Sequence, residues 1–223
     1  MYTFALMLLE QVIKQKHKFF WLFVNCILIL LLPPLDPIER LKPHLFLGLF
    51  TTLVLLNVYC ISTTKKQFYL FGSLGTLTII IPWIDFTIFG SGHSSPIGLL
   101  PFSLFFSFIS YKIIMHIFKQ SEVNSDTIFG AISGYIMMGI TGAIAAYQLH
   151  LMVPTAFSLP ANSEFSEFLY FSFVTISTLG YGDVLPISSF AKSLSIVLTV
   201  FGQFYMAIVV AIIIGKFISK TSV

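Results

Sequence analysis

The stretch TISTLGYGDVLP, residues 175–186, separates two apolar segments of a 223-residue chain. Gly180 and Gly182 flank a single tyrosine, and the residues from Thr178 to Gly182 include no carboxylate, imidazole, amine or thiol. Glycine contributes no side chain to packing and costs conformational entropy when it is ordered. Two glycines placed two residues apart therefore indicate that the backbone itself is what this stretch uses.

The composition predicts a membrane protein. Hydrophobic residues make up 57% of the chain and charged residues 9%, whereas soluble domains carry about 25% charged residues. Twelve basic and nine acidic residues are too few to solvate the surface of a soluble protein of this size. The net charge of +3 is too small to indicate a nucleic-acid partner, so the expected partner is the lipid bilayer. Cys26 and Cys60 lie in apolar runs and are interpreted as small packing residues.

Six apolar segments are long enough to cross a bilayer, which requires about 20 residues of helix. They lie at about 18–35, 43–63, 68–90, 99–119, 127–152 and 190–218. A seventh apolar segment, at 164–177, is too short to span and predicts a re-entrant helix. Residues 2–17 are interpreted as a further helix ahead of the first span. The expected fold class is an all-α membrane protein.

The basic residues predict the orientation of these spans. If the N-terminus is cytoplasmic, nine lysines fall at or near the inner side, and only Arg40, Lys42 and Lys192 fall outside. This distribution follows the positive-inside bias. Both chain ends are therefore expected on the cytoplasmic side of a plasma or inner membrane. A short polar linker near Glu122 divides the chain into residues 1–121, a four-span bundle, and residues 122–223. Because the linker is short, the bundle is expected to pack beside the last two spans of its own chain.

Span, short apolar helix, TLGYGD and span together resemble the pore module of potassium channels, whose signature is usually written TVGYG. The matching residues are Thr178, Leu179, Gly180, Tyr181 and Gly182, followed by the aspartate often found there, Asp183. Leu179 stands where valine is usual, and the resemblance covers residues 127–218. It implies a six-span, single-pore-loop channel of the prokaryotic type. One chain holds one loop, so four identical chains would surround an axis as a homotetramer.

In such channels the ion exchanges its water shell for rings of backbone carbonyl oxygens. The resemblance implies K⁺ binding by the carbonyls of Thr178, Leu179, Gly180 and Tyr181, with the Thr178 hydroxyl adding the innermost oxygens. For successive carbonyls to point the same way, alternate residues must take dihedral angles that side chains resist and glycine permits. K⁺ is then the transported ion, and no organic cofactor is expected.

The residues around the loop have expected supporting roles. Tyr181 is expected to point away from the ions and to lean on aromatic residues of the re-entrant helix, where Tyr170, Phe171 and Phe173 are available. Val174 stands where some relatives carry a buried glutamate that pairs with the aspartate after the filter. Asp183 is therefore expected to find another partner.

Glycines mark both of the last two spans. Gly202 follows Gly182 by 20 residues, the spacing at which related channels carry a hinge glycine, and hinge and close packing remain equal alternatives. The fifth span contains four glycines, which predict close packing against the sixth span. These are Gly130, Gly134, Gly139 and Gly142.

The fourth span lacks the regularly spaced arginines of a voltage sensor, and its only basic residues are Lys112 and Lys119 near its inner end. Opening is therefore expected to be nearly independent of voltage. Asp85 is the one acid inside a span. It is interpreted either as an acid hydrated near the outer interface or as a ligand or proton site. His93, His116 and His150 lie near membrane edges and are interpreted as interfacial residues.

The leading hypothesis is a potassium-selective, largely voltage-independent channel and not an enzyme. Two alternatives stay open, a weakly selective monovalent cation channel and a non-conducting subunit that modulates a partner channel. An intramembrane hydrolase built on Ser133 is disfavoured, because the residues around it lack a nucleophile-elbow pattern. The chain stops at Val223, just after the last span, so no soluble regulatory domain is expected in it.

Overall fold

The computed structural model describes residues 18–31, 42–89, 96, 98–119, 124–161 and 163–221. Within these ranges the regular structure is helical, apart from one isolated bridge between Phe157 and Pro186. The helices are α2 (Lys18–Leu30), α3 (Lys42–Ile61), α4 (Lys65–Phe89), α5 (Leu100–Lys119), α6 (Ser125–Met152), α7 (Phe165–Ile176) and α8 (Ser189–Thr221). The predicted all-α fold is confirmed over this part of the chain. The expected helix at 2–17, Arg40, His93 and the boundary near Glu122 lie outside the described residues.

Five helices, α3, α4, α5, α6 and α8, are long and apolar enough to cross a membrane, as in a multi-pass membrane protein. The prediction of six spans is not confirmed. The described part of the first span is α2, which has 13 residues, or about 20 Å of helix. A bilayer core is about 30 Å thick. The rest of the predicted span, residues 32–35, lies outside the described residues.

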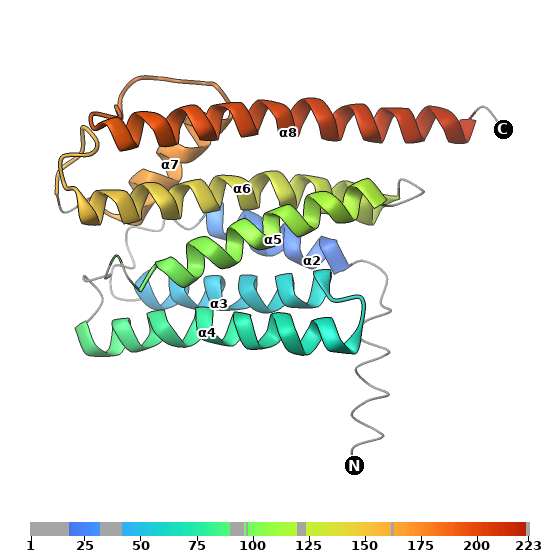
Figure 1. The fold of residues 1–223 in the computed structure, drawn as a ribbon, viewed down its shortest axis with the longest axis horizontal. Helices are drawn as coiled ribbons and strands as arrows, with labels where there is room; N and C mark the ends of the chain where they lie inside the picture. The colour runs from blue at the N-terminus through green and yellow to red at the C-terminus, as the bar shows by residue number, and fades with distance from the viewer. Residues whose placement is uncertain are drawn as a thin grey trace, which may run out of the picture.

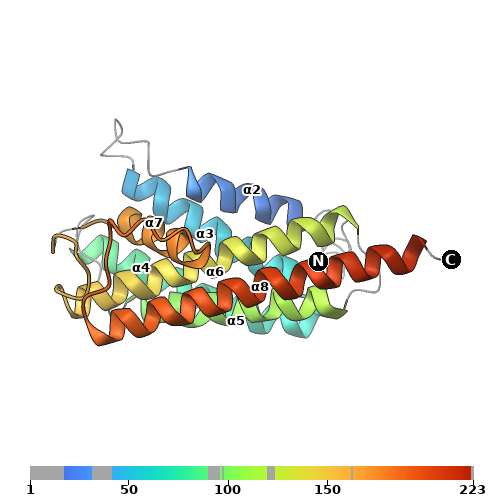
Figure 2. The ribbon, with the colours of Figure 1, turned by 90° about the horizontal axis from the view of Figure 1, so that it is seen from above.

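Consecutive helices from α2 to α6 run antiparallel, and α6 lies between the α2–α5 bundle and α8 (Figures 1 and 2). We call the end where α6 passes into α7 and α7 into α8 the loop end, and the opposite end the terminal end. Both α2 and α5 pack against α6 of the same chain. That the bundle packs beside the last two spans of its own chain within an assembly stays a prediction. The predicted re-entrant helix is present as α7, which enters from the loop end and whose chain returns to it.

The four glycines of α6 admit different neighbours, so the prediction that all pack against the last span is partly wrong. A Cβ on Gly130 would lie 3.2 Å from the ring of Phe19 in α2. A Cβ on Gly134 would lie 2.5 Å from the hydroxyl of Tyr205 in α8. Gly139 faces α7, and Gly142 faces both α7 and α8. The glycines make α6 the helix around which the others are arranged.

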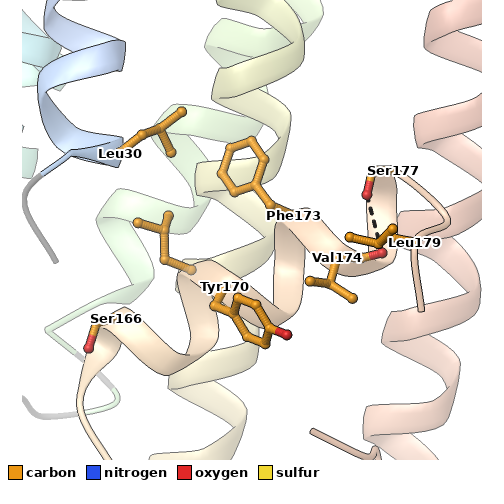
Figure 3. A pocket seen from close by; sticks show the side chains of 8 residues that line it. Leu30, Ser166, Tyr170, Phe173, Val174, Ser177 and Leu179 are labelled. Atoms are coloured by element: carbon orange, nitrogen blue, oxygen red, sulfur yellow. Dashed lines mark hydrogen bonds between the residues drawn. The ribbon is translucent and has the colours of Figure 1, made fainter. Parts of the chain in front are cut away.

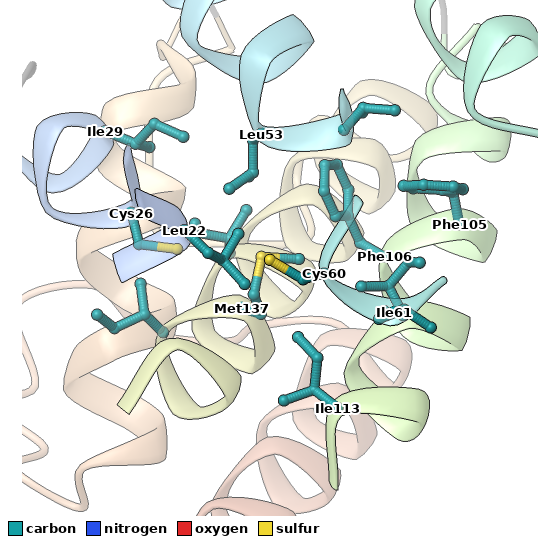
Figure 4. Close-up of a cluster of buried hydrophobic side chains, with 14 of the residues drawn as sticks. Leu22, Cys26, Ile29, Leu53, Cys60, Ile61, Phe105, Phe106, Ile113 and Met137 are labelled. Carbon is teal, nitrogen blue, oxygen red and sulfur yellow. The ribbon is translucent and has the colours of Figure 1, made fainter. Parts of the chain in front are cut away.

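The core of the bundle lies between α2, α3, α5 and α6 (Figure 4). Leu22, Leu53, Phe106 and Met137 are fully buried there. Cys26 and Cys60 belong to the same core. Both are free thiols and buried, in keeping with their interpretation as packing residues.

Contacts at the terminal end join the bundle to the last two spans. The amide of Phe19, in the first turn of α2, donates to Asp126 Oδ1 at the start of α6, at 3.0 Å. Lys216 Nζ of α8 donates to the carbonyl oxygen of Ile117 in the last turn of α5, at 3.1 Å. The carbonyls of a last helical turn have no partner within the helix, so Lys216 satisfies one of them. Asp85 lies in α4, and its side chain is outside the described residues.

Candidate functional site

The short helix α7 is held at its depth by α6. Ser172 Oγ donates to the carbonyl oxygen of Gly139 at 2.7 Å. A Cβ on Gly139 would overlap the ring of Phe173. Because both residues of α7 lie in its second half, these contacts fix how far its C-terminal end enters between α6 and α8.

The chain leaves α7 folded back on the helix. The amides of Leu179 and Gly180 both donate to the carbonyl oxygen of Val174, at 3.0 and 3.3 Å. The TLGYGD loop therefore starts at the C-terminal end of α7. A helix carries a partial negative charge at this end, so the start of the loop favours a cation.

Alternate residues of the loop adopt left-handed backbone angles. The φ values are 60° at Thr178, 59° at Gly180 and 77° at Gly182. The alternation expected from the sequence is therefore present. Thr178 is the one non-glycine residue with positive φ among those described, a conformation that costs an L-residue about 1–2 kcal/mol. Backbone strain of this kind persists where surrounding structure holds it, and it concentrates at functional sites.

Every residue from Ser177 to Asp183 is exposed in the single chain. The exposed fraction is 55% for Leu179 and 67% for Tyr181. Large apolar side chains gathered on an exposed surface commonly mark a binding surface. The loop thus offers its backbone on a surface that a single chain leaves open.

Asp183 finds its partner in Tyr170. The Tyr170 hydroxyl donates to Asp183 Oδ2 at 2.5 Å, and Asp183 Oδ1 accepts from the amide of Val184 at 3.0 Å. The bond from Tyr170 holds the pKa of the Asp183 carboxyl below its usual range, and it raises the pKa of Tyr170 to about 12. This hydrogen bond connects Asp183 to the middle of α7. The sequence predicted that Asp183 has a partner other than a glutamate, and that partner is Tyr170.

The other aromatic residues of α7 pack within the chain. The ring of Phe171 lies 5.0 Å from that of Phe157, and Phe171 is buried. Phe173 packs against Gly139. Tyr181 is mostly exposed, so the aromatic support expected for it stays a prediction, and it would have to come from a neighbouring chain.

The segment between α6 and α7 holds the far side of the loop, which sequence reasoning missed. Ser158 exchanges two hydrogen bonds with Leu185: its amide donates to the Leu185 carbonyl at 2.9 Å, and its Oγ accepts from the Leu185 amide at 2.7 Å. The amide of Ile187 donates to the carbonyl of Ala156 at 2.8 Å. These partners are about 30 residues apart, so no local pattern predicted them.

Gly202 brings α8 against the start of the loop. A Cβ there would lie 2.5 Å from the carbonyl oxygen of Ile176 and 3.1 Å from its Cα. Of the two alternatives for Gly202, close packing is present, and the hinge stays a prediction. The next residue, Gln203, was also missed by sequence reasoning. Its Nε2 lies 3.5 Å from Thr178 Oγ1. The signal that could have identified it is a lone amide in an apolar run.

A groove of about 490 Å³ lies beside the loop, between α2 and α7 (Figure 3). Leu30 of α2 faces α7 across it, and Val174 and Leu179 contribute to its lining. The groove is mainly apolar, and it reaches the side chain of a loop residue.

Other candidate groups carry no comparable arrangement. Ser133 Oγ donates to the carbonyl of Phe129 in its own helix, so in the described part of the chain its proton is given to a backbone oxygen and not to a catalytic base. His150, expected at the interface, is instead buried against Phe168, with Nε2 3.3 Å from the carbonyl oxygen of Ala161. Among the described residues, no group of three or more His, Cys, Asp or Glu side chains is placed to hold a metal ion.

Comparison with known proteins gives one match. No curated protein and no solved structure matches the chain. Residues 134–219, which contain most of α6, all of α7 and the loop, and nearly all of α8, match a family described as ion channels. The part of the chain that holds the strained TLGYGD loop is thus similar to ion channels, and this similarity supports an ion channel function.

Proposed function

We propose that four copies of this chain surround one axis and form a potassium-selective channel. The observation that carries the proposal is the left-handed backbone at Thr178, Gly180 and Gly182, within TLGYG and at the C-terminal end of α7. A filter that replaces an ion's water shell with carbonyl oxygens needs successive carbonyls on one side of the backbone. Alternating dihedral angles are the means by which a short segment achieves this.

The surroundings of the loop supply what such a filter requires. Gly139 and Ser172 fix the depth of α7, and its C-terminal dipole favours a cation below the loop. Tyr170 and Ser158 hold the outer part of the loop through Asp183 and Leu185. K⁺ ions would pass in single file along the carbonyl oxygens of Thr178, Leu179, Gly180 and Tyr181.

The bundle supports voltage-independent opening. In α5, Lys112 places its ammonium over the rings of Phe71 and Phe108, at 5.9 and 5.3 Å from their centroids. One charge moved across the whole membrane contributes only about 2.3 kcal/mol per 100 mV, and steep voltage dependence needs several. In this proposal both chain ends lie on the cytoplasmic side, in keeping with the lysines of the terminal end.

Flux from the purified chain in liposomes tests the proposal. Reversal potentials with K⁺ on one side and Na⁺ on the other should show strong preference for K⁺. Comparable Na⁺ permeability would favour the weakly selective cation channel. Absence of flux from a folded, correctly inserted chain would favour the modulatory subunit.

A matched pair of glycine variants tests the backbone itself. Within one chain a Cβ on Gly180 would meet nothing within 4 Å, so Gly180→Ala strains the chain through its positive φ, at a cost of about 1–2 kcal/mol per chain. We expect loss of K⁺ selectivity or of flux. Gly215→Ala, where a Cβ also meets nothing within 4 Å and φ is not positive, should behave as wild type. Equal selectivity in Gly180→Ala would contradict the proposed filter.

A further inference from the structure

α8 carries one amide side chain in its apolar middle. The run LTVFGQFYMAIVV at 198–210 contains Gln203 and no other amide or charged residue. Polar side chains in membrane-spanning helices face the protein interior or a water-filled cavity. Gln203 is exposed in the single chain, on the side of α8 where the TLGYGD loop begins.

Gln203 can reach Thr178 because α8 lies close to the end of α7. Gly202 lies against the backbone of Ile176 with no room for a Cβ. The amide of the following residue therefore lies beside the first residue of the loop. Gln203 Nε2 is 3.5 Å from Thr178 Oγ1, a long hydrogen bond by protein standards.

The Thr178 hydroxyl has two hydrogen-bond partners within the chain, the carbonyl of Ser177 and the amide of Gln203. It donates its proton to the carbonyl oxygen of Ser177 at 2.6 Å. A hydroxyl oxygen has two acceptor lone pairs. One faces the Gln203 amide, which leaves one for a cation at the inner mouth of the loop.

We propose that Gln203 is a positioning residue that sets, through the Thr178 hydroxyl, how strongly the innermost site of the filter holds a cation. This inference rests on the proposed function. The amide competes with the ion for electron density on the Thr178 oxygen, and it holds the hydroxyl in one orientation. Removing the amide makes that oxygen a stronger ligand for a cation that arrives from the terminal end.

Block by barium ions applied on the terminal-end side measures this affinity, because Ba²⁺ is a divalent cation close to K⁺ in size. In Gln203→Met, which keeps the length of the side chain and removes the amide, the half-blocking Ba²⁺ concentration should fall about threefold, the lower range expected for one neutral hydrogen bond. The melting temperature in detergent should stay as in wild type.

Two further variants separate this role from general polarity. Gln203→Asn keeps an amide but is one methylene too short to reach Thr178, so it should resemble Gln203→Met. Thr199→Val removes a hydroxyl that bonds only within α8, to Ser195 at 2.9 Å, and it should leave Ba²⁺ block unchanged.

The outcomes distinguish this inference from the proposed function. If wild type carries no K⁺-selective current, the proposed function fails. If wild type conducts and Gln203→Met shows wild-type Ba²⁺ block, the role of Gln203 is wrong while the channel stands. Wild-type block in Gln203→Asn, or an equal shift in Thr199→Val, also overturns it.

Discussion

α6 and α8 both pack against α7. Much more of α6 than of α8 is buried within the chain. In an 18-residue apolar stretch of each helix, 61% of the residues are buried in α6 and 22% in α8. α8 is nevertheless the more apolar of the two, with a mean hydropathy of 2.4 against 1.7. Apolarity in a membrane therefore does not decide which helix is central, because lipid satisfies an apolar side chain as well as protein does.

α6 differs from α8 in how closely its surface fits the neighbouring helices. Its glycines leave notches that Phe19, Tyr205, Phe173 and Leu198 occupy, and close approach gains dispersion contacts that lipid does not supply equally. α8 has one such notch in contact, at Gly202, and a second glycine, Gly215, that touches nothing within 4 Å. The exposed side of α8 is the surface that a four-chain assembly would cover or leave facing a cavity.

The largest effect is expected from filling a notch of α6. In Gly139→Val the new methyl groups would overlap the Phe173 ring, which displaces α7 and destabilises the fold by about 3 kcal/mol. The melting temperature in detergent should fall clearly, or folded protein should not be recovered.

Gly215→Val is the control on α8. It adds the same side chain where nothing lies within 4 Å, so stability should be close to wild type. Equal losses in the two variants would remove the distinction between the helices.

Gly202→Ala should have the next largest effect. The new Cβ would press on the Ile176 carbonyl at 2.5 Å. Moving α8 or the end of α7 to relieve this contact should cost about 2 kcal/mol, less about 1 kcal/mol regained from helix propensity. Because Ile176 precedes the loop, we expect a lower K⁺ over Na⁺ permeability ratio from bi-ionic potentials. A pure hinge would instead change open probability and leave this ratio intact.

A substitution on the exposed side of α8 tests whether a neighbouring chain covers it. The side chain of Phe204 is 60% exposed. If an adjacent chain packs against it, Phe204→Ala should weaken assembly by about 1 kcal/mol for each contact, because dispersion contacts are lost that lipid does not replace equally. The fraction of tetramer in dilute detergent, measured by light scattering after size exclusion, reports this.

Leu77→Ala on α4 is the matched control, because Leu77 is 56% exposed on a helix that lies at the outside of the bundle. It should leave assembly unchanged. The same loss of tetramer in both variants would contradict the idea that a neighbouring chain covers the exposed side of α8.

The smallest effect is expected at the outer part of the loop. The Tyr170 hydroxyl lowers the pKa of Asp183, so the support it gives is present above the unfolded pKa and is lost as pH falls through the lowered native pKa. In Tyr170→Phe the pKa of Asp183 rises towards its ordinary value, so current should decline at a higher pH than in wild type when the loop-end side is acidified. A current titration checks this.

Tyr111→Phe on α5, whose side chain is 57% exposed, should titrate as wild type. An unshifted titration in Tyr170→Phe would show that the bond to Asp183 does not support the conducting loop.

Local patterns in the sequence predicted the helices well. The short segment at 164–177 became α7 at Phe165–Ile176, and 127–152 became α6 at Ser125–Met152. Hydropathy and length are properties of one segment, so they can be read without knowing its neighbours. The first span was overestimated in the described residues, where α2 ends at Leu30, because hydropathy gives no direct account of where a helix ends.

Partners across the fold were predicted less well. Gly130 was assigned to the last span, and it receives Phe19 of α2. The sequence indicated that Asp183 lacked its usual partner, and the structure places Tyr170 there. Gln203 and Ser158 were missed because each acts on a loop that folds back from a distant segment.

The sequence by itself determined that the chain is a helical membrane protein and that the backbone of TLGYG is its distinctive chemical feature. Both follow from side-chain polarity and from the freedom of glycine, which each residue carries with it. Only the tertiary structure decided which helix fills each glycine notch, what holds Asp183, and where α8 approaches the loop. These depend on shape complementarity between segments far apart in the chain, and the energy of such contacts exists only once the helices are packed.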